Sequence, residues 1–299
     1  MIASFLTALL FALSVAFAAR SARLFGGAIA NLGRMGIALV LLGLWAELFG
    51  QGLRGQSLPW FIFSGVIGFG LGDIALFLAL TRIGPRLTVL LTQCLAAPFG
   101  ALMEWLWLGT SLRPVQLLCG AVILGGVALA LAPGHSHHGR IHVTRAGVIF
   151  GVFAALGQAG GAVISRKAYE IARLHELPID GLTAAYQRMV GGIVTALVCY
   201  AVLYFLKKPV PTEQKKEPVK IRGNWLWILL HALCGPVLGV SCYQWALSST
   251  PSGIVLPVVA TTPVLAIPFA WLIDGDRPGR QSLAGGVIAV AGAVALTLV

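Results

Sequence analysis

The stretch Phe69–Leu80, FGLGDIALFLAL, contains a single carboxylate, Asp73, in an apolar run with no opposite charge nearby in the sequence. In a membrane, such a charge costs about 2.5–3.5 kcal/mol on insertion scales unless it is paired, protonated or faces water. We therefore expect Asp73 to face the protein interior. There it acts either as a coupling or gating site for a substrate or a proton, or as a structural partner of Arg34 or of the loop residues Arg82 and Arg86.

Arg34 and Arg188 are each followed by methionine, and each lies near the start of its own apolar run. A long side chain near a helix end reaches the lipid headgroups easily, and the positive end of the helix dipole favours an acidic neighbour for each guanidinium. Both residues are coupling or gating candidates. Structural anchoring and substrate binding stay open as alternatives.

The segment HALCGPVLGVSCYQWAL, residues 231–247, is the apolar run that most suggests a solute-binding site. Its Gly235-Pro236 pair predicts a helix break that frees backbone carbonyls, and such breaks survive in membranes where the freed groups line a cavity or find side-chain partners. Together with glutamines in two other runs, its polar residues could hydrogen-bond an amphipathic ligand. The substrate-binding candidates are Gln93, Gln158, His231, Ser241, Tyr243, Gln244 and Trp245. His231 could carry a proton or simply bond a neighbouring helix.

Prolines inside apolar runs bend a helix and provide a hinge, and the hinge candidates here are Pro98, Pro236 and Pro263. Glu104 lies about a turn from the end of its run, next to Trp105 and Trp107. We expect this carboxylate to reach the membrane interface beside an aromatic belt.

Enzymatic and metal chemistry find little support. The sequence has no GxSxG, no HExxH and no Gly-rich phosphate loop, and its five cysteines lie in apolar runs without metal spacing. The histidines of HSHHGRIH, residues 135–142, have no acidic or cysteine ligand beside them, which favours a linker over a metal site. We therefore expect no catalytic residues, no metal and no cofactor. The basic residues sit in short loops, so a nucleic-acid partner is not expected.

The elements that must position these residues are membrane helices. The 299 residues are 58% hydrophobic and 10% charged, with a mean hydropathy of +0.89, whereas soluble domains carry about 25% charged residues. The apolar runs are about 20 residues long and lack the alternation of barrel strands, so helices must span the bilayer. Ten runs are predicted to do so: 2–19, 28–49, 58–81, 87–108, 114–132, 146–165, 182–206, 225–247, 253–273 and 282–299.

Loop charges give an orientation. Odd-numbered loops carry 14 Lys and Arg residues against five in even-numbered loops. The positive-inside rule then places the odd loops in the cytoplasm and both termini outside.

The chain also repeats itself. Residues from Thr81 align with residues from Ser248 at an offset of 165 to 167, so that Pro98 meets Pro263 and Gly126 meets Gly292. Each repeat has five helices, and an odd number forces the second repeat to enter the membrane from the opposite side. The expected units are a first repeat at 1–132, an inter-repeat loop at 133–145, and a second repeat at 146–299 that includes a charged loop at 207–224. Inverted repeats of this kind form a midplane site in many secondary transporters.

These features resemble the drug/metabolite transporter superfamily in its ten-helix EamA-type branch, which includes amino-acid and metabolite exporters. The resemblance rests on the Arg-Met pairs, the segment GDIALFLALTRIGPR, the prolines of helices 4 and 9 before short turns, and the Gly-rich helices 5 and 10. It implies a cavity bounded mainly by helices 1, 3, 4, 6, 8 and 9, and both termini in the cytoplasm, against the loop charges. The position matched to Thr110 or Gly275 is often Glu in that family, and neither half has it.

The sequence thus predicts a secondary transporter that moves a small organic solute by alternating access, as an exporter in a bacterial-type inner membrane. The solute class is an amino acid, amphipathic metabolite or drug. The expected partners are this solute and membrane lipids, with proton coupling open and a monomer or homodimer as the assembly. The alternatives are a membrane-embedded lipid- or metabolite-processing enzyme and a non-transporting assembly partner.

Overall fold

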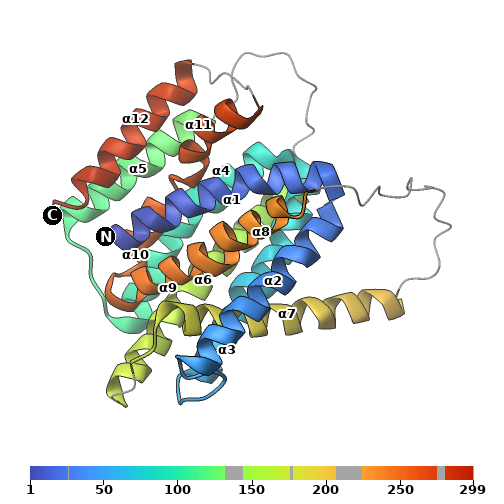
Figure 1. Ribbon diagram of the computed structural model, residues 1–299. Helices are drawn as coiled ribbons and strands as arrows, with labels where there is room; N and C mark the ends of the chain where they lie inside the picture. Colours follow the sequence, from blue (N-terminus) through green and yellow to red (C-terminus); the bar gives the residue numbers. More distant parts are fainter. Residues whose placement is uncertain (26, 132–143, 176–177, 207–223, 275–279, 299) are drawn as a thin grey trace.

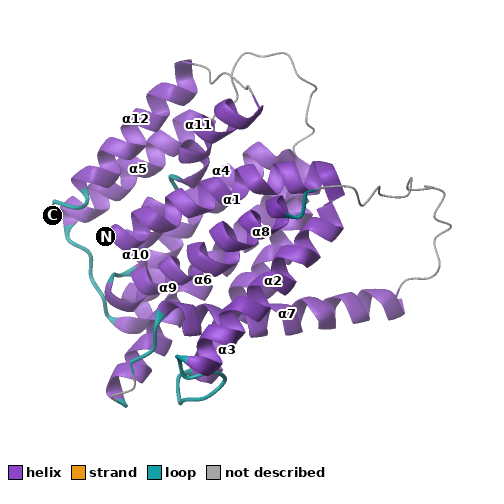
Figure 2. Ribbon diagram, in the orientation of Figure 1, coloured by secondary structure: helices purple, strands orange, loops and turns teal. Residues whose placement is uncertain are grey.

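The computed structural model describes residues 1–25, 27–131, 144–175, 178–206, 224–274 and 280–298. In these ranges every regular element is a helix and there is no strand (Figure 2). The elements are α1 (Ile2–Phe25), α2 (Gly27–Leu48), α3 (Leu58–Gly65), η1 (Val66–Gly72), α4 (Asp73–Leu108), α5 (Pro114–Leu131), α6 (Arg145–Leu174), α7 (Gly181–Leu206), α8 (Leu226–Ala232), η2 (Leu233–Val237), α9 (Leu238–Ser249), α10 (Ser252–Val259), α11 (Thr262–Asp274) and α12 (Arg280–Ala295).

Nine helical segments of the described chain are long and apolar enough to cross a membrane, and Arg280–Ala295 is a shorter apolar helix. We number these ten segments as spans 1 to 10. Span 3 comprises α3, η1 and the first part of α4, span 4 the rest of α4, span 8 comprises α8, η2 and α9, and span 9 comprises α10 and α11. The other spans are single helices. Spans 3 and 4 separate at Gly84, whose φ of 76° is a left-handed conformation that glycine adopts without strain. The predicted all-helical membrane fold is confirmed.

Equivalent helices of the two repeats pack antiparallel. A Cβ on Gly126 of α5 would lie 2.5 Å from the Ala289 amide of α12, and one on Gly292 would lie 3.0 Å from Ile123, so residue numbers rise along α5 as they fall along α12. Figure 1 shows these two helices side by side at one edge of the bundle. Spans 4 and 9 behave in the same way, since Gly100 faces Leu256 and Glu104 bonds Ser252. The repeats are therefore inverted.

Both repeats carry a π-helical segment at the same place. η1 begins at Val66 and η2 at Leu233, and the same offset aligns Asp73 with Val240. π-segments are rare and concentrate at functional sites. The predicted hinge Pro236 lies inside η2 and lacks the N–H that a regular helix needs. Pro263 is the second residue of α11, directly after the break at Ala260 and Thr261, whereas α4 continues as a helix through Pro98.

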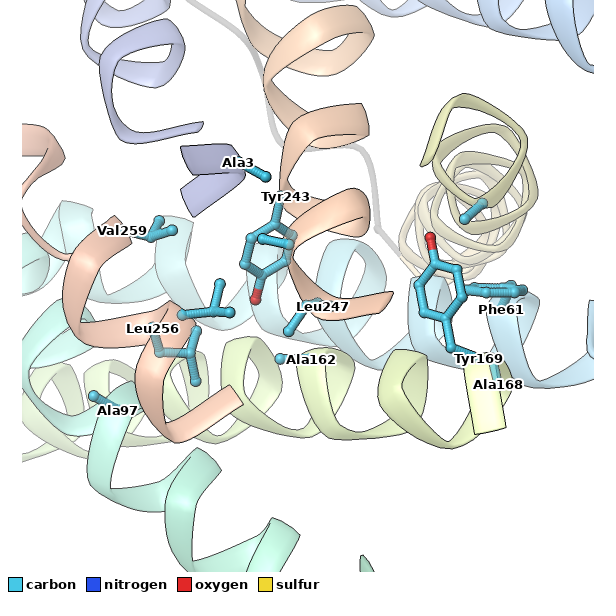
Figure 3. Packing of buried hydrophobic residues seen from close by; sticks show 13 residues of the cluster. Ala3, Phe61, Ala97, Ala162, Ala168, Tyr169, Tyr243, Leu247, Leu256 and Val259 are labelled. Atoms are coloured by element: carbon cyan, nitrogen blue, oxygen red, sulfur yellow. The ribbon is translucent and has the colours of Figure 1, made fainter. Parts of the chain in front are cut away.

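The two ends of the bundle differ in packing. We call the end where spans 1–2, 3–4, 5–6, 7–8 and 9–10 are joined the odd-loop end, and the other the even-loop end. Both termini lie on one side of the molecule, at the even-loop end (Figure 1). A buried cluster fills that half, with Tyr169 edge-on to Phe61 at 5.0 Å between ring centroids (Figure 3). The cluster includes Ala3, Phe61, Ala162, Ala168, Tyr169, Ala184, Tyr243, Ala246, Leu247, Val255 and Leu256.

Candidate functional site

Two adjoining compartments lie between the repeats. The deep compartment has a volume of about 160 Å³, and its lining includes Thr92, Gln158, Arg188 and Tyr243. The wide compartment, of about 370 Å³, is lined by residues such as Arg34 from the odd-loop halves of spans 1, 2, 4 and 8. Five of the described residues border both compartments: Phe11, Phe69, Asp73, Leu76 and Val240. The wide compartment therefore extends from the middle of the membrane toward the odd-loop end.

Spans 2 and 7 contribute more to this cavity than the resemblance implies. Arg34 and Met35 line the wide compartment from span 2, and Met189 and Gly192 line it from span 7. Arg188 joins them from the deep compartment. The two Arg-Met dipeptides thus both face the cavity, one from each repeat.

Asp73 lies directly after η1 and faces both compartments. The guanidinium groups of Arg34 and Arg188 both interact electrostatically with its carboxylate. No hydrogen bond or ion pair joins that carboxylate to another residue in the described part of the chain. Arg82, one suggested partner, instead donates to the Leu78 carbonyl at 2.8 Å and lies over the Phe150 ring. The side chain of Arg86, the other suggested loop partner, lies outside the described residues.

Arg188 is 3% exposed, and its Nε and Nη1 atoms have no hydrogen-bond partner among the described residues. Its Cζ lies 5.0 Å from the centroid of the Phe69 ring and 5.8 Å from that of Tyr243. A Cβ on Gly68 of η1 would lie 3.0 Å from its Nη2, and the close approach of η1 to α6 at Gly161 bounds the same space. Cation–π contacts offset part of the desolvation but supply no acceptor for the N–H groups.

Arg34 holds the equivalent place in the first repeat but in a more open setting. It is half-buried, and its Nε donates to Asn31 Oδ1 at 2.9 Å. A Cβ on Gly235 of η2 would lie 3.9 Å from its Nη1. Each arginine thus faces the π-segment of the other repeat, but only Arg188 is enclosed.

Several other predicted site residues are brought together here. Gln158 Nε2 donates to Gln93 Oε1 at 3.2 Å, which joins the deep compartment to the wide one. Tyr243 lines the deep compartment, and His231 lines the wide one at 7% exposure. The Tyr243 hydroxyl and His231 Nδ1 lack hydrogen-bond partners among the described residues.

Three predicted residues of span 8 lie outside both compartments. Ser241 donates to the Val237 carbonyl of its own helix. Gln244 is fully buried in the even-loop half and its amide has no partner among the described residues. Trp245 is 54% exposed and lines a surface hollow beside Met1 and Ala3.

The position of Glu104 differs from the one predicted from the sequence. It does not reach the interface but is 2% exposed and accepts a hydrogen bond from Arg166 Nε at 3.0 Å. The same carboxylate accepts hydrogen bonds from the amide and hydroxyl of Ser252, the first residue of α10. Arg166 Nη1 also donates to the Leu247 carbonyl at 2.9 Å. This network ties α4, α6, α9 and α10 together at the even-loop end.

The described residues contain no group of His, Cys, Asp and Glu that could hold a metal ion, and their five cysteines are free thiols. The histidines of residues 135–142 lie outside the described residues.

Comparison with known proteins assigns the chain to a family. No curated protein matches it, whereas 29 chains of solved structures do. One of these, titled only "Crystal structure of protein", is 19% identical with a TM-score of 0.67, covering 99% of this chain and 96% of that chain. At this identity the likeness shows the fold alone. The model of the EamA-like transporter family matches residues 1–132 and 145–298, nearly the whole sequence. The chain is therefore an integral membrane protein that belongs to the EamA-like transporter family.

Proposed function

We propose that this protein is a secondary transporter that moves a small organic solute across a bacterial-type inner membrane by alternating access, in the direction of export. The solute class is an amino acid, amphipathic metabolite or drug. The observation that carries the proposal is the charged cavity between inverted repeats, which extends toward the odd-loop end while the even-loop end is packed. Inverted repeats with a midplane site alternate by rocking one bundle against the other.

The unequal surroundings of the two arginines support alternation. Arg188 is enclosed against η1, and Arg34 is half-buried near η2. If the repeats exchange conformations, Arg34 becomes enclosed against η2 and Arg188 opens toward the even-loop end. Exchange of the two repeat conformations would therefore give a second state, open at the other end, with the same fold.

The direction follows from loop charge. The odd loops carry most of the Lys and Arg residues, and such loops stay in the cytoplasm. A cavity that extends toward that end loads from the cytoplasm. The packed even-loop half then faces the outside and opens only to release solute.

Counterflow in proteoliposomes tests the proposal. Purified protein is reconstituted with a mixture of unlabelled amino acids and amphipathic metabolites inside, and uptake of labelled members of the same mixture is followed without ATP. We expect saturable, solute-specific counterflow that protein-free vesicles lack. Absence of counterflow for every member, or chemical conversion of a solute in place of movement, would contradict the transport proposal.

A further inference from the structure

We propose that the deep compartment is an anion site, in which Arg188 binds the carboxylate of an amphipathic solute that carries one net negative charge. The inference rests on the proposed transport function, because it names the substrate class of the same cavity. It predicts that a monocarboxylate binds better than its neutral amide and better than a zwitterion of the same shape.

The buried guanidinium of Arg188 lacks acceptors among the described residues. Arg188 is 3% exposed, and two of its nitrogens have no acceptor among the described residues. A buried charged donor without an acceptor is costly, and removing that cost is a driving force for binding. The guanidinium is a planar fork of donors whose geometry matches a carboxylate in two parallel hydrogen bonds.

Neighbouring hydroxyl groups point to the same ligand chemistry. Thr92 Oγ1 and the Tyr243 hydroxyl both line the deep compartment, and both lack partners among the described residues. Hydroxyl groups can donate to the acceptor-only oxygens of a carboxylate. Orphaned donors from spans 4, 7 and 8 therefore converge on one small space.

Charge balance sets the sign of the ligand. Among the described residues, the charged ones that line the two compartments are Asp73, Arg34 and Arg188. Two guanidinium groups against one carboxylate leave one positive charge uncompensated, even with His231 uncharged. A ligand with one net negative charge neutralises this excess, whereas a zwitterion leaves it in place. Buried charge of one sign is stable only when a partner compensates it.

The remaining walls fit the apolar part of such a solute. Phe11, Phe69, Leu76 and Val240 border both compartments. An apolar body that leaves the carboxylate at Arg188 can extend between these side chains into the wide compartment. The solute is thus expected to be amphipathic, with its acid group innermost.

Thermal unfolding with matched probes tests the site. The probes are 4-methylpentanoate, its amide 4-methylpentanamide, and leucine, with benzoate and benzamide as a second acid and amide pair. We expect an acid to raise the Tm of the purified protein more than its amide does, and 4-methylpentanoate to do so more than leucine. The fitted Kd of the acid is expected to be about tenfold or more tighter than that of the amide, as for a hydrogen bond to a charged group.

Variants locate the effect. Arg188→Gln should remove the preference for acid over amide, whereas Arg54→Gln, which changes an exposed loop arginine, should keep it. If Arg188→Gln does not fold, Tyr243→Phe keeps the ring but removes one hydroxyl donor and should weaken the preference. An equal response to acid and amide in the unchanged protein, or a preference that survives Arg188→Gln, would overturn the inference.

The outcomes separate this inference from the transport proposal. Counterflow that is equal for an acid and its amide would support the transport proposal but contradict the anion site. Binding of the acid at Arg188 without counterflow of any solute would support the anion site but contradict the transport proposal.

Discussion

At the scale of single residues, the charge of the cavity depends on Asp73, whose carboxylate faces it together with Arg34 and Arg188. Its carboxylate has no close partner in the described chain and interacts electrostatically with Arg34 and Arg188. Asp73→Asn removes the only negative charge that the described residues present to the compartments, so an anionic solute should be held more tightly and released more slowly. We expect correctly folded protein whose maximal flux falls by about tenfold, which corresponds to about 1.4 kcal/mol.

The same variant tests proton coupling. If Asp73 carries a proton during transport, flux through Asp73→Asn should lose its dependence on a pH gradient, although Arg34, Arg188 and His231 still face the cavity. Glu47→Gln, which changes an exposed carboxylate of the same repeat, is the control and should leave rate and pH dependence unchanged. An unaltered rate and pH profile in Asp73→Asn would make this carboxylate a structural residue only.

The sequence singled out Asp73, Arg34 and Arg188, which line the cavity, but it misplaced Glu104 at the interface and was less informative about uncharged residues. A carboxylate or guanidinium in an apolar run stands out, because lipid cannot solvate it. Phe11, Phe69 and Thr92 gave no comparable signal, since aromatic and hydroxyl residues are common in membrane helices. Tyr243 and Trp245 are two positions apart, which is about 200° around a helix, so only one of them can face the cavity.

At the scale of elements, the Glu104 network links four helices at the packed end. Glu104→Gln removes the charge that pairs with Arg166, whose side chain is 12% exposed, and weakens the acceptor at the first residue of α10. Loss of one partner of a buried pair costs about 3–5 kcal/mol. We expect a clearly lower Tm and, in proteoliposomes, faster leak of the loaded solute through the even-loop end.

A second ion pair, on α6 like Arg166, is the matched control for Glu104→Gln. Lys167 and Glu170 are 3.0 Å apart, but their side chains are 27% and 42% exposed. Exposed pairs contribute about 0–1 kcal/mol, so Glu170→Gln should shift Tm very little. Equal shifts for the two glutamate variants would show that the Glu104 network does not hold the end closed.

The crossing of η1 and α6 gives a second test at this scale. A Cβ on Gly157 would lie 2.6 Å from the Gly72 Cα, so Gly157→Ala must push the two helices apart. Overpacking of this kind costs about 1–3 kcal/mol, and the shift also moves Asp73, which directly follows Gly72. We expect lower stability and slower flux.

Gly36→Ala is the control for the glycine substitution. Nothing lies within 4 Å of a Cβ at Gly36, which is also helical. Alanine is favoured over glycine in a helix by about 1 kcal/mol, so this variant should be as stable as the parent or slightly more so. A loss of stability in Gly36→Ala as large as in Gly157→Ala would remove the packing explanation.

Element boundaries were predictable where Gly and Pro mark them, and less so elsewhere. The Gly235-Pro236 pair indicated a break in span 8, and η2 lies there because proline cannot donate its hydrogen bond. The matching η1 contains no proline, only Gly68, Gly70 and Gly72, and a glycine pattern equally fits close helix packing. Comparison of the two repeats could have located η1 from η2.

At the scale of the whole molecule, the internal repeat predicted the architecture because an odd number of helices per copy admits only one arrangement in a membrane. It could not predict which end is closed. That depends on side chains the repeats do not share: neither Glu104 nor Asp73 is matched by an acidic residue in the second repeat, whose counterpart of Asp73 is Val240. Asymmetric side chains on a symmetric frame thus determine which state is observed.

Orientation in the membrane decides whether the open cavity loads from inside or outside. Loop charges place the odd-loop end in the cytoplasm, whereas the family resemblance implies cytoplasmic termini and so the reverse. With the five native cysteines replaced, single cysteines at Gln56→Cys, in an even loop, and Lys215→Cys, in an odd loop, can be labelled in intact cells with a membrane-impermeant maleimide. We expect Gln56→Cys to react at once and Lys215→Cys only after permeabilisation. The opposite pattern would place the cavity on the outer face, so that the same geometry would load solute from outside and the exporter proposal would fail.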